Sequence, residues 1–280
     1  MKPCISQATT MSTGFEADLE AYARGGFGAV EIWLTKLETY LATHALDDAR
    51  RLFETHKIAP VAAASQGGLL LSRGEERAAH WSLFERRLEL LQALGVPVLV
   101  VVADFLHEPA GEDFGRAARS LADAGARAGE RGVRLALEFQ KSSKFCASLD
   151  TTLAFTAQSS AENVGICLDF FHYYTGPSKF EDFAYLTAEQ LAWVQISDLS
   201  GTPRELAGDA DRILPGDGDF QIDAILDQLQ SIGYNGYVSL EVLNPQLWQV
   251  AADRVADFGF QSVSRALGSR ASAGAARGGL

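Results

Sequence analysis

The stretch PVLVVVA at residues 97–103 decides the fold, because it is apolar throughout and β-branched at most positions. A strand with one solvent-facing side alternates apolar and polar residues, whereas a strand buried on both faces is apolar without interruption. Such strands are typical of parallel sheets with both faces covered. The stretch therefore predicts a strand of a parallel sheet.

The same kind of pattern repeats along the chain, where short apolar runs alternate with longer amphipathic segments. Eight strand–helix units at this chain length favour a closed barrel over an open sheet. We therefore expect an α/β fold, a single (β/α)8 TIM barrel over residues 1–267, followed by a flexible tail at 268–280. The expected strands are 4–8, 29–34, 59–65, 97–103, 133–139, 164–170, 192–197 and 236–243. The expected helices are 15–26, 46–57, 75–95, 112–131, 149–159, 180–187, 221–233 and 247–267.

Composition and charge limit the partners of this protein. The 280 residues carry a formal net charge of −12, and an acidic surface repels the phosphate backbone of nucleic acids. The three cysteines are too scattered for a disulfide framework or a zinc motif. The first residues lack a signal-peptide core, and the apolar run at 96–103 is far too short to span a membrane. We expect a cytoplasmic protein that acts on a small molecule, with no nucleic-acid or membrane partner; the sequence leaves a homo-oligomer open.

Four polar side chains stand near the carboxyl ends of the last four expected strands: Glu138, Asp169, Gln195 and Glu241. In a parallel barrel these strand ends converge on one mouth. Three carboxylates placed together would be driven to protonate unless a cation compensated their charge. Gln195 interrupts the apolar run WVQIS, and its amide oxygen is a neutral, hard ligand. Three carboxylate oxygens and one amide oxygen suit Mn²⁺ or Mg²⁺ better than zinc. The alternative is that each is an isolated polar residue on a half-buried strand.

The chain resembles the sugar phosphate isomerase/epimerase superfamily, the xylose isomerase-like TIM barrels, over about residues 1–265. The segments that carry the resemblance are GFGAVEIW (26–33), LEF (137–139), GICLDFFH (165–172), VQISD (194–198), RILPGDGDFQIDAIL (212–226) and GYNGYVSLEV (233–242). The resemblance implies that Glu138, Asp169 and Glu241 are metal ligands. It also implies that His172 contacts the substrate and that Arg212 reaches an oxygen of the substrate. An alternative for Arg212 is a loop charge paired with Asp209 or Asp211.

The chain departs from the family pattern at three places. Most members have a histidine as fourth ligand, where this chain has Gln195; the bacterial 3-dehydroshikimate dehydratases resemble it in carrying glutamine there. Keto-sugar 3-epimerases carry a second glutamate where this chain has Lys144, which is either a substrate contact or a surface residue. The dehydratases carry an arginine that can hold a substrate carboxylate, but AAASQGGLLLS (62–72) contains no cation before Arg73.

These residues predict chemistry at a carbon next to a carbonyl. A divalent metal chelated by a carbonyl and an adjacent hydroxyl acidifies the C–H between them and stabilises the resulting enediolate. Glu138 and Glu241 would lie on opposite sides of the metal, so that one takes a proton from carbon and the other returns one. We therefore predict a metal-dependent isomerase or epimerase that acts on a ketose or related small polyhydroxy carbonyl compound.

Three other functions remain to be weighed. The main alternative is a dehydratase of a cyclic ketone such as 3-dehydroshikimate or an inosose, in which His172 would protonate the leaving hydroxyl. A DNA-repair endonuclease on this fold is set aside, because such enzymes use a cluster of metal-binding histidines at the barrel mouth. Three of the five histidines of this chain, His44, His56 and His80, fall on expected helices, and the net charge of −12 disfavours DNA. The intact carboxylates argue against a barrel that has lost its metal, but the absence of the usual histidine ligand leaves this function open. Glu31 could line the pocket or anchor the barrel floor, and Trp33 or Phe171 could wall a small polyol.

Overall fold

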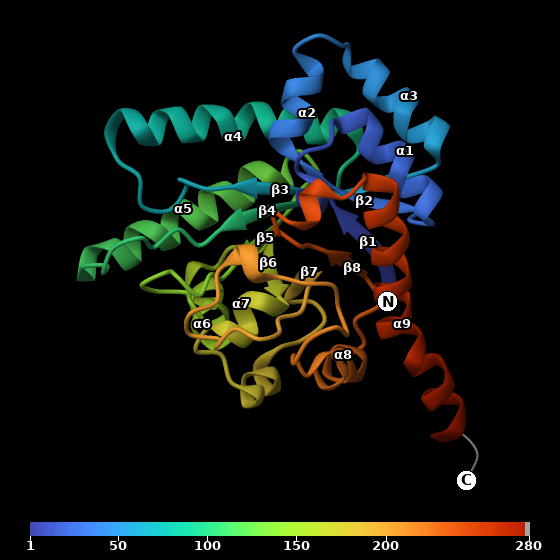
Figure 1. Ribbon diagram of the computed structural model, residues 1–280. Coiled ribbons are helices and arrows are strands. Elements are labelled where there is room, and N and C mark those ends of the chain that lie inside the picture. The colour runs from blue at the N-terminus through green and yellow to red at the C-terminus, as the bar shows by residue number, and fades with distance from the viewer. Residues whose placement is uncertain (278–280) are drawn as a thin grey trace. The chain divides into compact units, whose positions relative to one another are not determined.

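Eight parallel strands follow one another in sequence order around a closed barrel, as the computed structural model of the chain shows for residues 1–277 (Figure 1). The strands are β1 (Lys2–Ser6), β2 (Ala29–Trp33), β3 (Ala59–Gln66), β4 (Val98–Val102), β5 (Arg134–Glu138), β6 (Val164–Asp169), β7 (Leu191–Ile196) and β8 (Tyr237–Leu240). Each coincides with an expected strand within about three residues at either end. The predicted (β/α)8 fold is confirmed.

Helices separate the strands along the chain. The α-helices are α1 (Phe15–Gly25), α2 (Leu34–Leu41), α3 (Leu46–His56), α4 (Gly74–Leu94), α5 (Gly111–Gly129), α6 (Leu149–Ser159), α7 (Phe170–Thr175), α8 (Ile222–Ser231) and α9 (Ala252–Arg277). The short 3-10 helices are η1 (Gln7–Thr10), η2 (Phe180–Tyr185), η3 (Asp209–Asp211) and η4 (Leu247–Gln249).

Four of these elements differ from expectation. Helices α2 and α7 were not predicted, because each begins directly after a strand with no glycine or proline to mark the boundary. The segment expected as an α-helix at 180–187 is the 3-10 helix η2. Helix α9 runs to Arg277, beyond the expected helix end at 267; the flexibility expected of residues 268–280 stays a prediction, and residues 278–280 lie outside the described residues.

The chain divides into two compact units that alternate along the sequence. The first comprises Met1–Glu31, Lys36–Ala59 and the residues from Gln195 onward; the second comprises Ile32–Thr35 and Pro60–Val194. The expectation of one domain over 1–267 stays a prediction.

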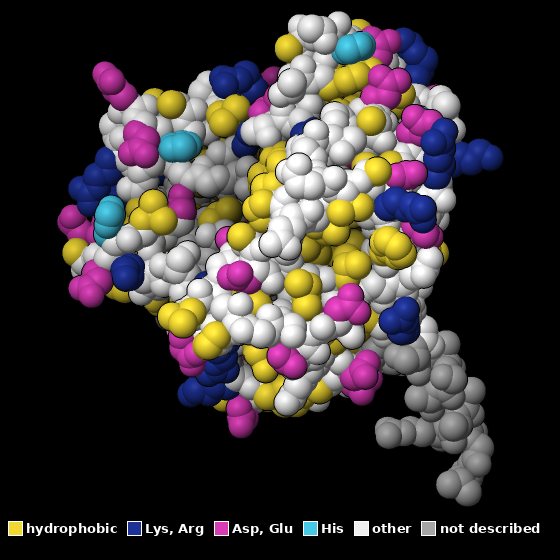
Figure 2. Space-filling view, viewed as in Figure 1, with side chains coloured by type: hydrophobic (Ala, Val, Ile, Leu, Met, Phe, Trp, Pro, Cys, Tyr) yellow, Lys and Arg dark blue, Asp and Glu magenta, His cyan; other side chains and the backbone are white. Residues whose placement is uncertain are grey.

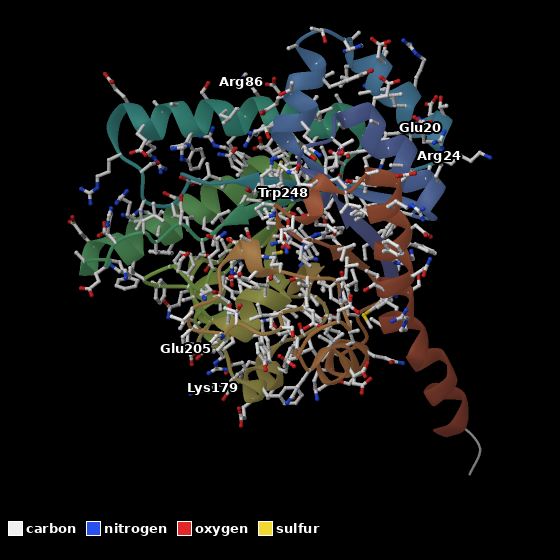
Figure 3. All side chains as sticks on the ribbon, viewed as in Figure 1. Glu20, Arg24, Arg86, Lys179, Glu205 and Trp248 are labelled. Atoms are coloured by element: carbon white, nitrogen blue, oxygen red, sulfur yellow. The ribbon has the colours of Figure 1, made fainter. Side chains whose placement is uncertain are left out.

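In the first unit, β1 lies between β2 and β8. Ile5 is in register with Val30 on one side and with Leu240 on the other, and all three side chains are buried. Helix α9 packs along α1, and the two helices are drawn next to each other in Figure 1. Glu20 and Arg24 form an exposed i,i+4 ion pair on α1, and both are labelled at the edge of Figure 3.

In the second unit, β4 pairs with β3 and β5, and β5 also pairs with β6. Leu99, Val100 and Val101 are buried, as the unbroken apolar run predicts. The register places Glu138 opposite Val102 on one side and opposite Cys167 on the other. The ends of β5 and β6 are thereby aligned, which brings the residues that follow them into one region.

The described surface carries charges of both signs. On the face drawn in Figure 2, acidic side chains are spread singly rather than gathered in one patch. Within residues 1–277, no helix has both the length and the apolar character that crossing a bilayer would require.

Candidate metal centre

Three side chains of the second unit form a cluster that could hold a metal ion: Glu138 at the end of β5, Asp169 at the end of β6, and His172 in α7. One ligand atom from each lies within 4.8 Å of the other two. The distance from Nε2 of His172 to Oε1 of Glu138 is 3.9 Å. All three residues are buried. Sequence reasoning placed the two carboxylates here as ligands and His172 beside them as a substrate contact; the cluster adds His172 as a possible ligand.

Asp169 both ends its strand and fixes the position of His172. Its Oδ1 accepts hydrogen bonds from the backbone N–H groups of Phe171 (2.6 Å) and His172 (3.1 Å), so Asp169 is the N-cap of α7. This cap turns the chain from strand to helix at a single residue. The aspartate expected only as a ligand therefore also has a structural role, which explains the sharp strand-to-helix transition.

Burial makes this cluster a good cation site. Two carboxylates removed from water repel each other and lose hydration unless a positive charge or protons compensate them. Carboxylate oxygens and an imidazole nitrogen are common ligands of divalent ions. The donor set therefore fits a divalent metal ion.

A second polar network lies in the first unit around Gln195. The Nε2 of Gln195 donates hydrogen bonds to Oε1 of Glu31 and to Oε1 of Glu241, each at 2.9 Å. The other oxygen of Glu31 accepts a hydrogen bond from Ser239 Oγ at 2.6 Å. All four residues are buried. Glu31, whose role the sequence left open, is therefore a direct partner of Gln195.

Arg212 balances the negative charge of this network. It is buried, with 1% of its surface exposed, and its Nη1 donates to Oε2 of Glu241 at 3.4 Å. Its Nη2 donates to Oδ1 of Asp209 at 2.8 Å. The expected pairing with Asp209 is present, but Arg212 is buried rather than a solvated loop charge. Its contact with a substrate oxygen stays a prediction.

Asp198, directly after β7, organises the loop that carries Arg212. This carboxylate is fully buried. Its Oδ1 accepts backbone hydrogen bonds from Leu199 (2.9 Å) and Phe220 (3.0 Å). Its Oδ2 accepts backbone hydrogen bonds from Gly216 (2.9 Å) and Gly218 (3.0 Å). A Cβ at Gly218 would collide with Oδ1 of Asp198, so only glycine fits there.

Arg212 is held by the same anchor through its neighbour. The backbone of Ile213 pairs with that of Asp198 in both directions, at 2.9 and 3.0 Å. Sequence reasoning did not assign Asp198 a role. The glycines of PGDGDF were the available signal, because two glycines in one loop indicate close backbone approach.

The remaining candidates, Lys144, Trp33 and Phe171, differ in burial. Lys144 is exposed, and its backbone N–H donates to the carbonyl of Phe105 at 2.8 Å. Trp33 is half-buried and Phe171 is buried.

Trp248 was not among the residues singled out in the sequence. It lies near the centre of Figure 3, and its Nε1 donates to the carbonyl of Ala8 at 3.0 Å.

The segment after β3 is held by arginines that follow it. Arg77 donates to the carbonyl of Leu69 at 2.9 Å, and Arg116 donates to the carbonyl of Leu71 at 2.7 Å. Nearby, burial raises the pKa of Asp104, whose Oδ2 accepts a hydrogen bond from the backbone of Gly68. The two arginines therefore hold the loop backbone.

The sequence matches the xylose isomerase-like TIM barrel family over residues 19–263, so the chain belongs to this family. This confirms the resemblance drawn from the motifs. Membership defines the class of protein: a xylose isomerase-like TIM barrel.

Two proteins and one crystal structure are similar to this chain over most of its length. Inosose isomerase from Halalkalibacterium halodurans is 28% identical over 261 residues, which are 90% of this chain and 92% of that protein. The 3-dehydroshikimate dehydratase from Pseudomonas aeruginosa is 28% identical over 234 residues, 81% of this chain but 36% of that longer protein. A crystal structure of the IOLI protein with a zinc atom bound has a TM-score of 0.88 and 26% identity, covering 96% of this chain and 99% of that chain.

Proposed function

We propose that this protein is a divalent-metal-dependent isomerase or epimerase that acts through an enediolate on a small polyhydroxy carbonyl compound. The observation that carries the proposal is the buried cluster of Glu138, Asp169 and His172, whose ligand atoms lie within 4.8 Å of one another. Family membership and the inosose isomerase relative support the same class of reaction. An inosose, a cyclic ketone bearing several hydroxyl groups, is the substrate that this relative suggests.

We propose Glu138, Asp169, Gln195 and Glu241 as the protein ligands of one metal ion. The donor chemistry and the position of each residue at or near a strand end support this set. Oxygen ligands favour Mn²⁺ or Mg²⁺, although the IOLI protein bound zinc in its crystal structure. When bound, such an ion supplies positive charge that polarises the carbonyl and hydroxyl oxygens of a substrate.

The remaining steps belong to the side chains. Glu138 and Glu241 are the proposed pair that removes a proton from carbon and returns one. Arg212 lies beside Glu241 and offsets its charge, while its guanidinium is also the proposed contact for a substrate oxygen. His172 is proposed to hold or transfer a proton at Nε2, the atom that faces Glu138. Lys144 is proposed as a further substrate contact at the surface.

The charges after β3 favour an uncharged substrate. A substrate carboxylate would need a cation there, but Arg77 and Arg116 donate to backbone carbonyls of the loop. Asp104 in the same region offers an oxygen that could accept a hydrogen bond from a sugar hydroxyl. A neutral polyol ketone therefore fits this segment better than a carboxylic acid.

A second candidate is a dehydratase of 3-dehydroshikimate or of an inosose. Gln195 favours it, since the resembling dehydratases carry glutamine at this place, and a dehydratase is among the relatives. Elimination shares the first proton removal with isomerisation. The difference lies in whether a hydroxyl on the neighbouring carbon then leaves, with His172 as its proton donor.

The test follows the fate of the substrate. Mn²⁺-loaded protein is incubated with an inosose in D₂O, and deuterium next to the carbonyl is measured by NMR. In parallel, 3-dehydroshikimate is offered and the ultraviolet absorbance of a catechol acid is recorded. Exchange without loss of water supports the isomerase, and formation of the catechol acid supports the dehydratase. The test variant is Glu138→Gln, which keeps the shape of the side chain but removes the proposed base. Activity equal to that of the wild type would contradict the proposal.

We propose a cytoplasmic protein whose partner is its small-molecule substrate. A homo-oligomer is compatible with this proposal, and analytical ultracentrifugation measures it directly.

A further inference from the structure

Glu31 is a fully buried carboxylate in β2 that the proposed metal ligands do not include. Its exposed fraction is 0%, and each of its oxygens has a defined partner. Oε1 accepts from Gln195 Nε2 at 2.9 Å, and Oε2 accepts from Ser239 Oγ at 2.6 Å. A buried carboxylate costs several kcal/mol of stability unless hydrogen bonds compensate for its lost hydration. Glu31 makes such hydrogen bonds, and one of them is to the proposed ligand Gln195.

The contact restricts the orientation of the Gln195 carboxamide. A glutamine side chain can flip so that its nitrogen and oxygen exchange places. Here the nitrogen donates to two carboxylates, Glu31 and Glu241. A flipped amide would lose both charge-assisted hydrogen bonds and would bring its oxygen against two negatively charged groups. The two carboxylates therefore hold the nitrogen on their side of the amide and the oxygen on the other.

We propose that Glu31 is a positioning residue that fixes the Gln195 carboxamide with Oε1 as its ligand atom, while Ser239 holds Glu31 in place. The inference rests on the proposed metal site and adds the means by which an amide serves as a ligand there. An unrestrained glutamine samples several orientations, so a cation would have to order the side chain before the amide oxygen could bind, at a cost in conformational entropy. Glu31 orders the amide in advance, as carboxylates commonly do for metal-bound histidines.

A simpler role would also make Glu31 matter for metal binding. A buried negative charge attracts a cation from any nearby position, without acting through Gln195. The two roles differ in one respect. A positioning residue loses its effect when the residue it positions is removed, whereas a charge keeps its effect.

A double-mutant cycle separates the two roles. The affinity for Mn²⁺ is measured by isothermal titration calorimetry, and by electron paramagnetic resonance of free Mn²⁺ where binding is weak. The proteins are the wild type, Glu31→Gln, Gln195→Ala and the double variant. The amide introduced by Glu31→Gln can either donate or accept, so the contact with Glu241 alone then fixes the orientation of the Gln195 carboxamide. We expect Glu31→Gln to weaken Mn²⁺ binding about 10- to 100-fold in the wild-type background. In the Gln195→Ala background we expect it to change binding less than about threefold.

Two further variants control for the change of charge and for a failure to fold. Glu54→Gln, an exposed position in the same unit, makes the same charge change and is expected to leave the affinity unchanged. If Glu31→Gln does not fold, Ser239→Ala replaces it in the cycle, since it removes the hydrogen bond that holds Glu31. Equal losses in both backgrounds, or no loss in either, would overturn the positioning role. A wild-type protein that binds no Mn²⁺ would instead overturn the proposed metal site itself.

Discussion

Replacing Asp198 by asparagine tests whether one buried carboxylate organises the loop after β7. The carboxylate accepts four backbone N–H groups, two on each oxygen, from residues on both sides of the loop. Asparagine has nearly the same shape but offers only one accepting oxygen. Its NH₂ group would face two backbone donors that have lost their acceptor.

The size of the effect follows from those lost contacts. Two charge-assisted hydrogen bonds disappear, and each contributes about 1.5–3 kcal/mol to stability. Their sum is about 3–6 kcal/mol if the loop stays in place, and relaxation of the loop moves the result toward the lower value. A loss of about 3 kcal/mol lowers the Tm of a chain of this size by roughly 6–12 °C.

The assay is thermal unfolding followed by circular dichroism, with urea unfolding as a second measure of the free energy. Asp217→Asn is the matched control, since Asp217 is exposed in the same loop and loses the same charge. We expect that control to change the Tm by less than about 2 °C. If Asp198→Asn and Asp217→Asn unfold at the same temperature, Asp198 does not anchor the loop and the reasoning is refuted.

Three further predictions concern charged side chains. Arg212→Met leaves the buried Glu241 without its cation, so we expect the free energy of unfolding to fall by about 3 kcal/mol in urea titrations; an unchanged value would mean that the pair contributes nothing. Burial raises the pKa of Asp18 to about 7 despite Lys36 beside it. The folded state therefore binds the extra proton between about pH 4 and pH 7. Relative to Asp18→Asn, the wild type should lose up to about 1.4 kcal/mol of stability per pH unit as pH rises through that range; a gain would show that the ion pair outweighs burial. Lys144→Ala removes an exposed side chain, so the Tm should stay within about 2 °C while KM for the substrate rises; an unchanged KM would place Lys144 outside the site.

The strands were predictable because their signal is local. A run such as Val98–Val102 is apolar on both faces, and burial on both faces follows directly from a parallel barrel. Helices α2 and α7 were not predictable in the same way. Each starts where a strand stops, and at α7 the boundary depends on the side chain of Asp169 capping the next turn.

The positions of the candidate ligands along the strands were predictable from the sequence, but their contacts were not. Glu138 and Asp169 stand where apolar strands end, and in a parallel barrel these strand ends converge on one mouth. The partner of Gln195 could not be found this way, because Glu31 lies 164 residues away and meets it only through the register of separate strands. Asp198 was missed for a related reason, since its oxygens accept from backbone groups that leave no mark in residue type except the glycines.

The central claim is that the protein binds a divalent cation through side chains at its strand ends. Its most direct measurement is calorimetric titration of metal-free protein with Mn²⁺, for the wild type and for Asp169→Asn in parallel. Asparagine keeps the cap of α7 but removes one charged ligand. The account predicts one ion bound per wild-type chain and at least about tenfold weaker binding to the variant. No uptake by the folded wild type, or equal affinity in the two proteins, would contradict it.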